Sequence, residues 1–371
     1  MSNPLFTPFT MRDVTLANRV VVSPMCQYNS ADGAANDWHL MHLGQYAIGA
    51  GALIFTEATA VSPVGRISPR CLGLYSDDCE RELKRVIDFC KEYGVAEMGI
   101  QIAHAGRKAS THPPLDGGAP LKADEGAWET VAPSALAYAD GWHTPKALDE
   151  AGLAEVKQQF VDASVRAARV GFTVNELHVG HGYLLHQFLS PISNRRDDRY
   201  GGSTDNRMRF PLEVFEAVRA AWPANLPLGV RFSATDYVDE GWSLDESVRF
   251  AAALKERGCD FVDITGGGLD PRQKISVGPG YQVPYAERIK RETGIATMAV
   301  GMITQPEQAN AIVAEGQADM VALARGMMYD PRWAWHAAEA LGDETPYSRM
   351  YARAHPSKWP QAFPKRAQAA E

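Results

Sequence analysis

Short apolar runs alternate along the chain with longer segments in which apolar and polar residues follow a helical pattern. Runs of this length are typical of strands, whereas the longer segments favour helices. The predicted strands span residues 19–25, 52–58, 96–104, 173–179, 227–234, 261–266, 296–302 and 320–325. The predicted helices span residues 38–49, 78–93, 149–170, 205–221, 243–257, 281–292, 304–315 and 332–341.

Residues at the ends of the helical segments support these boundaries. Ser243 begins the sequence Ser-Leu-Asp-Glu, which is typical of a capping box at a helix start. Five glycines follow helical segments directly, where a left-handed C-terminal cap is expected. They are Gly94, Gly171, Gly258, Gly294 and Gly316.

Eight strands, each followed by a helix, predict an α/β fold of the (β/α)₈ TIM-barrel type. A doubly wound sheet is the rival arrangement, but it usually has fewer strands and a glycine-rich turn after the first. Here Ser-Pro-Met-Cys follows the first run, and no GxGxxG is present there. Because no linker divides the chain, we expect a single domain over residues 1–371. Residues 105–148, after the third strand, form a long insertion rich in Pro, Gly and Trp, which we expect to cap a site.

Composition narrows the class of protein. The chain has 45% hydrophobic residues and a net charge of −8 without a basic block, which argues against nucleic acid as the main partner. No apolar run is long enough to predict a membrane span, and the N-terminus lacks the pattern of a secretory signal. The five cysteines are scattered, which disfavours an iron–sulfur cluster or a zinc knuckle. We therefore expect a cytoplasmic protein with reduced thiols.

Polar residues and glycines gather at the C-terminal ends of the predicted strands, where barrels of this type carry their chemistry. Gly301 and Arg325, at the ends of the seventh and eighth strands, suit a phosphate. Gln101 and Arg231 would face the barrel centre and suit a flat ring with carbonyl groups and an imide N–H. Arg231 alone is equally consistent with a buried ion pair. Together the four residues indicate a flavin mononucleotide (FMN).

Six motifs carry a resemblance to a known family. They are SPMCQY (23–28), QIAHAGRKA (101–109), HVGHGYLLHQFLSPISNRRDDRYGGS (178–203), RFSATDY (231–237), GYQVPYAERI (280–289) and AVGMIT (299–304). In these motifs the chain resembles the Old Yellow Enzyme family of FMN-dependent ene-reductases, and most closely its thermophilic-like branch. The resemblance extends from near the N-terminus to about residue 341.

The resemblance implies a set of site residues. Two histidines, His178 and His181, would bind the carbonyl oxygen of the substrate, and Tyr183 would deliver a proton. Tyr28 would line the substrate pocket. The residues implied to contact tightly but non-covalently bound FMN are Ser23, Pro24, Met25 and Cys26 along the flavin, Ala58, Gln101 and Arg231 at the isoalloxazine edge, and Gly301, Ala324 and Arg325 at the phosphate.

The activity that the resemblance implies is that of an NADPH dehydrogenase or ene-reductase. NADPH or NADH would reduce the FMN, and flavin N5 would then pass a hydride to the C=C bond of an α,β-unsaturated carbonyl compound. Cys26 would tune the redox potential of the flavin. One departure from the family is Ala324, where members usually carry glycine. The backbone N–H of Ala324 is retained, so binding of the phosphate is still expected.

The resemblance also bears on assembly. It implies a homodimer or homotetramer in which the C-terminal tail, residues 342–371, reaches the active site of a neighbouring subunit. Arg353, as a substrate-binding residue, or Trp359 would make this contact. A solvated tail is the alternative reading.

Other functions remain open at this level. A flavin reductase of nitro compounds or nitrate esters would use the same site, and a non-enzymatic flavin protein is a further alternative. A larger dienoyl-CoA reductase would need an iron–sulfur cluster, and an aldolase or lyase barrel would need a Schiff-base lysine or a metal site at a strand end. Zinc at His178 and His181, with His186 as a third ligand, lacks the H-E-x-x-H pattern. We therefore expect no bound metal.

Overall fold

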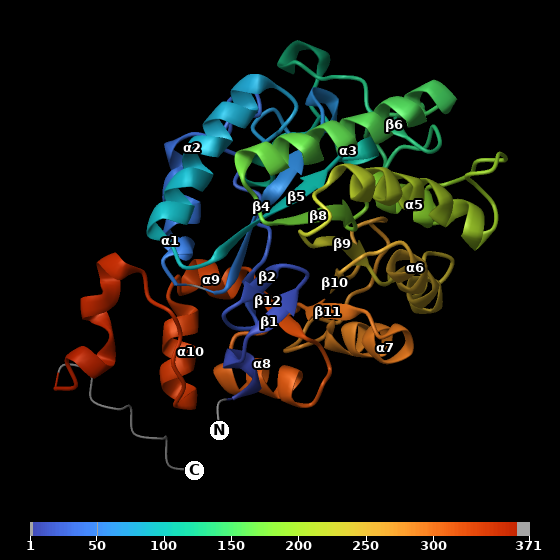
Figure 1. The fold of residues 1–371 in the computed structure, drawn as a ribbon. Coiled ribbons are helices and arrows are strands. Elements are labelled where there is room, and N and C mark those ends of the chain that lie inside the picture. The colour runs from blue at the N-terminus through green and yellow to red at the C-terminus, as the bar shows by residue number, and fades with distance from the viewer. Residues whose placement is uncertain (1–2, 50, 362–371) are drawn as a thin grey trace.

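Eight parallel strands close into a barrel in the computed structural model, which describes residues 3–49 and 51–361. The barrel strands are β3 (Val20–Val22), β4 (Leu53–Ala60), β5 (Glu97–Ala103), β8 (Val174–Val179), β9 (Leu228–Ser233), β10 (Phe261–Thr265), β11 (Ala296–Ala299) and β12 (Met320–Leu323). Around the barrel they follow the chain order, and β9 pairs with β10 on one side while β12 pairs with β3 on the other (Figure 1). The predicted TIM barrel is confirmed, since each predicted run overlaps one of these strands, and only β4 extends beyond its run, by two residues.

Helices surround the barrel on its outside (Figure 1). Eight of them begin and end within two residues of the predicted segments. They are α1 (Asp37–Ala47), α2 (Asp77–Tyr93), α3 (Glu150–Val170), α5 (Thr204–Ala221), α6 (Leu244–Glu256), α7 (Val283–Thr293), α8 (Pro306–Ala314) and α10 (Trp333–Leu341). Two short helices, α4 (Leu184–Leu189) and α9 (Arg325–Tyr329), were not predicted because neither is long enough to show a helical period.

The helix ends agree with the sequence except at one glycine. The capping box of α6 is present, since Ser243 Oγ accepts from Glu246 N and Glu246 Oε2 accepts from Ser243 N. Four of the five glycines have the expected positive φ. Gly94 does not, because its φ is −89°, and the predicted left-handed cap is wrong there. A Cβ atom at Gly94 would instead lie 2.3 Å from the carbonyl oxygen of Cys90 and 2.8 Å from that of Ala47. Close approach of the backbones, and not φ, requires this glycine.

A hairpin that the sequence did not predict lies at the N-terminal ends of the barrel strands. It consists of β1 (Phe9–Met11) and β2 (Val14–Leu16), which pair in antiparallel register. Asp13 N donates to the carbonyl oxygen of Asn225, shortly before β9, and Arg12 Nε donates to Asp260, directly before β10. Apolar side chains of the hairpin join the core cluster inside the barrel. The hairpin therefore occupies the end of the barrel opposite to the strand ends that carry the candidate site.

The insertion of residues 105–148 lies between β5 and α3, as expected. It contains short 3₁₀ turns and two short parallel strands, β6 (Val131–Ala132) and β7 (Lys146–Ala147). Its contacts reach the loops after two other barrel strands, because Trp128 Nε1 donates to Val64 O and Arg107 donates to Leu269 O. Within the described ranges, none of the helices has the length and apolar character needed to cross a membrane.

Candidate active site

Strand register brings the predicted residues of the barrel centre side by side. Ala58 on β4 pairs with Gln101 on β5, and His178 on β8 pairs with Arg231 on β9. At the far side of the barrel, Ser23 N donates to Leu323 O, which joins the end of β3 to the residue before Ala324. The segment Ser23–Cys26 therefore lies beside the segment that leads into α9. These residues lie on or directly after six different strands, and only closure of the barrel brings them to one end.

Two buried acidic residues, which were not predicted as site residues, support the polar residues of the barrel centre. Gln101 Nε2 donates to Glu176 Oε1 at 2.8 Å, and Arg231 Nε lies 3.1 Å from Asp263 Oδ2. Both carboxyl groups are fully buried. Burial raises the pKa of Glu176 well above its usual value, and the charge of Asp263 raises it further. Burial also raises the pKa of Asp263, against the lowering effect of Arg231.

The charges in this group follow from the geometry. Asp263 lies within ion-pair distance of the Arg231 guanidinium, so we expect it to carry the negative charge that balances the arginine. Glu176 accepts from the side-chain amide of Gln101, and it holds a proton more readily than Asp263 does. Arg231 thus forms the buried ion pair that the sequence analysis named as an alternative. Its contact with a flavin stays a prediction. A single acidic residue within an apolar strand was the signal that could have identified both carboxyl groups.

His178, on β8, and His181 and Tyr183, just after this strand, form a cluster in which His178 contacts both other rings. The rings of His178 and His181 have centroids 5.0 Å apart, and those of His178 and Tyr183 are 5.1 Å apart, each pair in a T-shaped arrangement. His178 Nε2 lies 3.2 Å from His181 Nδ1, and His181 Nε2 lies 3.0 Å from Thr265 Oγ1. The structure therefore brings together the three residues expected to bind and protonate a substrate, and it adds Thr265, which was missed.

The protonation of the two rings can be inferred from their partners. Gly180 N donates to His178 Nδ1, so a neutral His178 carries its hydrogen on Nε2 and donates it to His181 Nδ1. His181 then donates from Nε2 to Thr265. Desolvation lowers the pKa of His178 well below its usual value, and Arg231 lowers it further. Desolvation, followed by the neighbouring His178, does the same to the pKa of His181. Both imidazoles are therefore neutral hydrogen-bond donors at pH 7.

Tyr183 follows a tight turn in the backbone. His181 has a φ of 54° and Gly182 a φ of 74°, after which α4 begins at Leu184. A Cβ atom at Gly182 would lie 2.2 Å from the carbonyl oxygen of Gly268, so no larger residue fits in this position. Desolvation raises the pKa of Tyr183 well above its usual value. The phenol therefore keeps its proton at neutral pH and is a hydrogen donor.

Cys26 and Tyr28 lie in the segment that follows β3, on another side of the same site. Tyr28 has a φ of 51°, and its hydroxyl is close enough to the Cys26 thiol for each group to influence the pKa of the other. Desolvation raises the pKa of Cys26, and the neighbouring Glu57 raises it further, so the thiol is protonated. Ala58 and Tyr183 line one small cavity together with Cys71. Residues expected to contact the flavin and residues expected to contact the substrate are therefore close to each other.

The residues expected to bind phosphate follow β11 and β12. Gly301 has a φ of 114°, and a Cβ atom there would lie 3.2 Å from both Gln282 N and the ring of Tyr281. Ala324 is the N-cap residue of α9 and Arg325 is its first residue. Arg325 is exposed, and no carboxylate of the described residues lies within ion-pair distance of it. An accessible cation beside a backbone that excludes side chains fits a phosphate group.

The structure does not bring the C-terminal tail to the site of its own chain. Arg353 lies in an exposed 3₁₀ turn (Arg349–Ala354), and Trp359 is 61% exposed. The preceding Ser348 donates from its backbone N to Ile48 O and from Oγ to Tyr93 O. These two carbonyl groups lie where α1 and α2 end, at the end of the barrel that faces away from the site. Residues 362–371 of the expected tail lie outside the described residues.

His186 is engaged in other contacts than those of a metal ligand. Its Nδ1 accepts from Gly182 N, and its Nε2 lies 3.0 Å from Asp236 Oδ1. Among residues 3–49 and 51–361, no three His, Cys, Asp or Glu side chains are grouped so that they would hold a metal ion.

Comparisons with known proteins agree with this geometry. The model of the NADH:flavin oxidoreductase / NADH oxidase family matches residues 4–344. A protein named NADPH dehydrogenase from Geobacillus sp. (strain WCH70) is 45% identical over 355 residues, which covers 95% of this chain and 99% of that protein. The NADPH dehydrogenase of Bacillus subtilis (strain 168) is 42% identical, with 95% and 99% covered. The solved structure of morphinone reductase has a TM-score of 0.77 at 26% identity and covers 93% of this chain and 91% of that one.

Proposed function

Because the chain belongs to the NADH:flavin oxidoreductase / NADH oxidase family, we propose that it is an ene-reductase that uses NADPH to reduce the C=C bond of α,β-unsaturated carbonyl compounds. The cofactor of this oxidoreductase is FMN. The observation that supports the proposal most directly is the contact of neutral His178 with both neutral His181 and protonated Tyr183, at the barrel end that also carries Gln101 and Arg231.

The residues at the strand ends fit FMN. Gln101 and Arg231 would contact the flavin ring, and Gly301, Ala324 and Arg325 would hold its phosphate. The segment Ser23–Cys26 and Ala58 would lie along the ring system. When bound, FMN accepts a hydride from the nicotinamide cofactor and donates one to the activated alkene. A cation at Arg231, balanced by buried Asp263, would stabilise negative charge on the ring.

His178 and His181 would bind the carbonyl oxygen of the substrate. Each neutral ring has one N–H to donate, and these are directed to His181 and Thr265. A substrate oxygen would accept from them instead and would thereby be polarised, which draws electron density away from the alkene. By comparison with other enzymes, one such donor lowers the barrier by about 2.7–4 kcal/mol.

Tyr183 would supply the proton. Its raised pKa keeps the hydroxyl protonated over the neutral range, so it is suited to act as a general acid. The ring contact with His178 would hold it beside the bound alkene. Tyr28 would form another wall of the same pocket.

Two further features are part of the proposal. The insertion of residues 105–148 would cap the site, since Lys108 donates to the carbonyl oxygens of both His181 and Gly268. Arg353 or Trp359 would act in the site of a neighbouring subunit in a homodimer or homotetramer, because both are exposed and lie away from the site of their own chain.

The purified protein tests the cofactor and the reaction together. It should be yellow, bleach when NADPH is added under nitrogen, and regain its colour when 2-cyclohexenone is added. A colourless protein that binds no FMN would contradict the proposal.

The double variant His178→Ala/His181→Ala tests the role of the histidines. It should retain FMN and lose enone reduction by at least 100-fold, because both donors to the substrate oxygen are absent. Unchanged enone reduction in this variant would mean that the histidines have a packing role and do not bind the substrate oxygen.

A further inference from the structure

A buried pair of His186 and Asp236 lies directly behind the segment Gly180–Tyr183, and the proposed reaction assigns it no task. His186 is in α4, which follows that segment, and Asp236 follows β9, the next strand of the barrel. His186 Nε2 lies 3.0 Å from Asp236 Oδ1, and both side chains are completely inaccessible to solvent. A carboxylate and an imidazole buried together at this depth are costly unless every polar atom is bonded.

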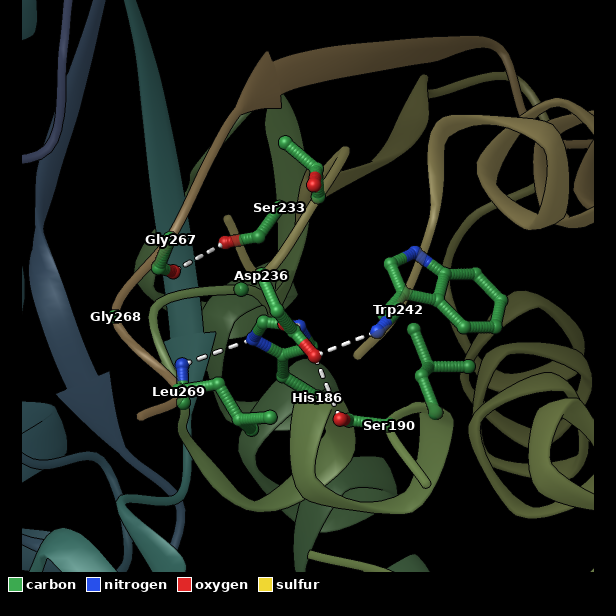
Figure 2. Close-up of polar contacts among 12 residues, drawn as sticks. His186, Ser190, Ser233, Asp236, Trp242, Gly267, Gly268 and Leu269 are labelled. Carbon is green, nitrogen blue, oxygen red and sulfur yellow. Dashed lines mark hydrogen bonds and ion pairs between the residues drawn. The ribbon is translucent and has the colours of Figure 1, made fainter. Parts of the chain in front are cut away.

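The bonds of the pair define its hydrogen positions. Gly182 N donates to His186 Nδ1 at 2.9 Å, so Nδ1 has no hydrogen and the hydrogen of the neutral ring is on Nε2, which lies 3.0 Å from Asp236 Oδ1. The other carboxylate oxygen, Oδ2, accepts from Ser190 Oγ at 2.6 Å and from Trp242 N at 2.7 Å (Figure 2). A flip of the imidazole ring would therefore break the bond from Gly182 N and would move Nε2 away from Asp236.

Gly182 is the residue between the two site residues His181 and Tyr183. Its backbone N–H is bonded to His186, and its carbonyl oxygen accepts from Gln187 Nε2 at 2.7 Å. The backbone of His181 is held separately, because Ser233 Oγ accepts from His181 N and donates to Gly267 O, the second of these bonds being visible in Figure 2. The strained left-handed turn at His181 and Gly182 is thus fixed by side chains from two other segments of the chain.

We propose that His186 and Asp236 are positioning residues for the substrate-binding segment: His186 holds the Gly182 N–H, and Asp236 fixes the ring of His186. In this arrangement the pair determines where His181 and Tyr183 present their side chains to the substrate. A hydrogen bond from a backbone N–H to an oriented imidazole keeps the turn in one conformation, and small displacements of reacting groups have large effects on rate. The inference rests on the proposed function of the segment.

Two substitutions separate the two bonds of His186. Asparagine places its side-chain oxygen near the position of Nδ1, so His186→Asn keeps an acceptor for Gly182 N and removes the N–H group that faces Asp236 Oδ1. Glutamine reaches the position of Nε2 with its amide nitrogen, so His186→Gln keeps an N–H group beside Asp236 Oδ1 and leaves Gly182 N without an acceptor. A role limited to stability predicts that the activity of each variant follows its unfolding midpoint. A positioning role predicts that the more stable variant, His186→Gln, is the less active one.

The experiment uses the FMN-loaded enzyme. We expect His186→Gln to lower kcat/KM for 2-cyclohexenone by about 100-fold with an unfolding midpoint close to that of the native chain. His186→Asn should retain more of kcat/KM and unfold more easily, because the buried Asp236 Oδ1 loses the N–H group that faces it. Amide hydrogen exchange over residues 178–189 should be faster in His186→Gln than in His186→Asn. Ser164→Ala is the matched control, since it removes a buried bond to Asn175 on the outer side of the barrel and should lower the midpoint alone.

The inference is overturned if kcat/KM falls in proportion to the unfolding midpoint in both variants, or if exchange over residues 178–189 is the same in both. If neither variant folds, Ser190→Ala removes one bond of Asp236 and leaves the pair in place. It should raise exchange over the same residues by a smaller amount, and unchanged exchange would also overturn the inference. If the native enzyme does not reduce 2-cyclohexenone, the proposed function fails, whereas the exchange measurements still test the positioning role.

Discussion

Burial sets the charge of each residue that would meet the substrate. Desolvation lowers the pKa of His178 and of His181 and raises the pKa of Tyr183, so all three groups are neutral and carry a hydrogen at pH 7. The carbonyl oxygen of the substrate would be neutral when it binds and would gain negative charge only during the reaction. Neutral hydrogen-bond donors suit such an oxygen, because the bonds that they form become stronger as the charge develops. The cations Arg231 and Lys108 act on the rings through their charges and lower the pKa of both histidines.

Lys108 is the residue whose titration we expect to be visible in the activity. Its Nζ donates to His181 O at 2.9 Å and to Gly268 O at 2.8 Å, and it lies over the rings of Tyr138 and Tyr183. Burial lowers the pKa of Lys108 to about 8, with a further contribution from Arg107. Below pH 8 the ammonium group is charged and both bonds are charge-assisted, whereas above pH 8 the charge is lost.

We therefore predict that kcat/KM for an enone declines as the pH rises through about 8. The pKa values of Tyr138 and Tyr183 are raised, so these neighbours do not titrate in the same range. Lys108→Met keeps the apolar stem and lacks the charge, so its activity should be lower and should show no decline near pH 8. A pH profile of Lys108→Met with the same inflection as the native enzyme would contradict this assignment.

At the scale of elements, glycines that look alike in sequence have different physical tasks. Gly94 and Gly316 both follow helices, but only Gly316 has a positive φ, of 74°, and no atom lies within 4 Å of its Cβ position. Gly94 has an ordinary φ and is required because α1 and α2 bring backbone atoms against it. Sequence position alone does not distinguish strain in φ from contact with a neighbouring element.

We predict that Gly316→Asn leaves the free energy of unfolding nearly unchanged, because asparagine tolerates the left-handed conformation. Gly94→Asn should lower the free energy of unfolding by about 1–3 kcal/mol, the typical effect of forcing a side chain into a packed position. Denaturant unfolding of the two variants measures the difference. Equal free energies of unfolding for the two variants would show that the backbone around Gly94 accommodates a side chain without loss of stability.

At the scale of the whole molecule, the candidate cofactor site joins the two sides of the barrel. The residues expected to bind the flavin ring lie on β4, β5 and β9, and those expected to bind the phosphate follow β11 and β12. A ligand that contacts strands on both sides binds the folded chain and has no equivalent site in the unfolded chain. Its binding is therefore linked to the stability of the barrel as a whole.

We predict that FMN raises the unfolding midpoint of the cofactor-free protein in a concentration-dependent way. At a free concentration 100 times the Kd the stabilisation should be about 2.7 kcal/mol. Riboflavin, which lacks the phosphate, should stabilise less, because it makes no contact with Arg325. Thermal unfolding with each ligand measures this, and equal shifts with FMN and riboflavin would contradict the assignment of the phosphate site.

The sequence was sufficient for the barrel because the relevant signals are local. Apolar runs and helical patterns depend on residues only a few positions apart, and burial on both faces keeps each run apolar. The same locality explains the misses: α4 and α9 are too short for a period, and the hairpin of residues 9–16 lies in a segment for which no strand was predicted. For the site, the resemblance in six motifs pointed to His178, His181 and Tyr183, which the structure brings into contact.

The sequence by itself thus determined the order of strands and helices and the polar residues at the strand ends. Only the tertiary structure decided which of these residues meet. The pairing of Gln101 with Glu176, of Arg231 with Asp263 and of His186 with Asp236 depends on the register between strands and on the course of the loops. These partners are tens of residues apart in the chain, and no local pattern encodes their distance. Closure of the barrel, driven by burial of the apolar strands, brings them together and shifts their pKa values or fixes their hydrogen bonds.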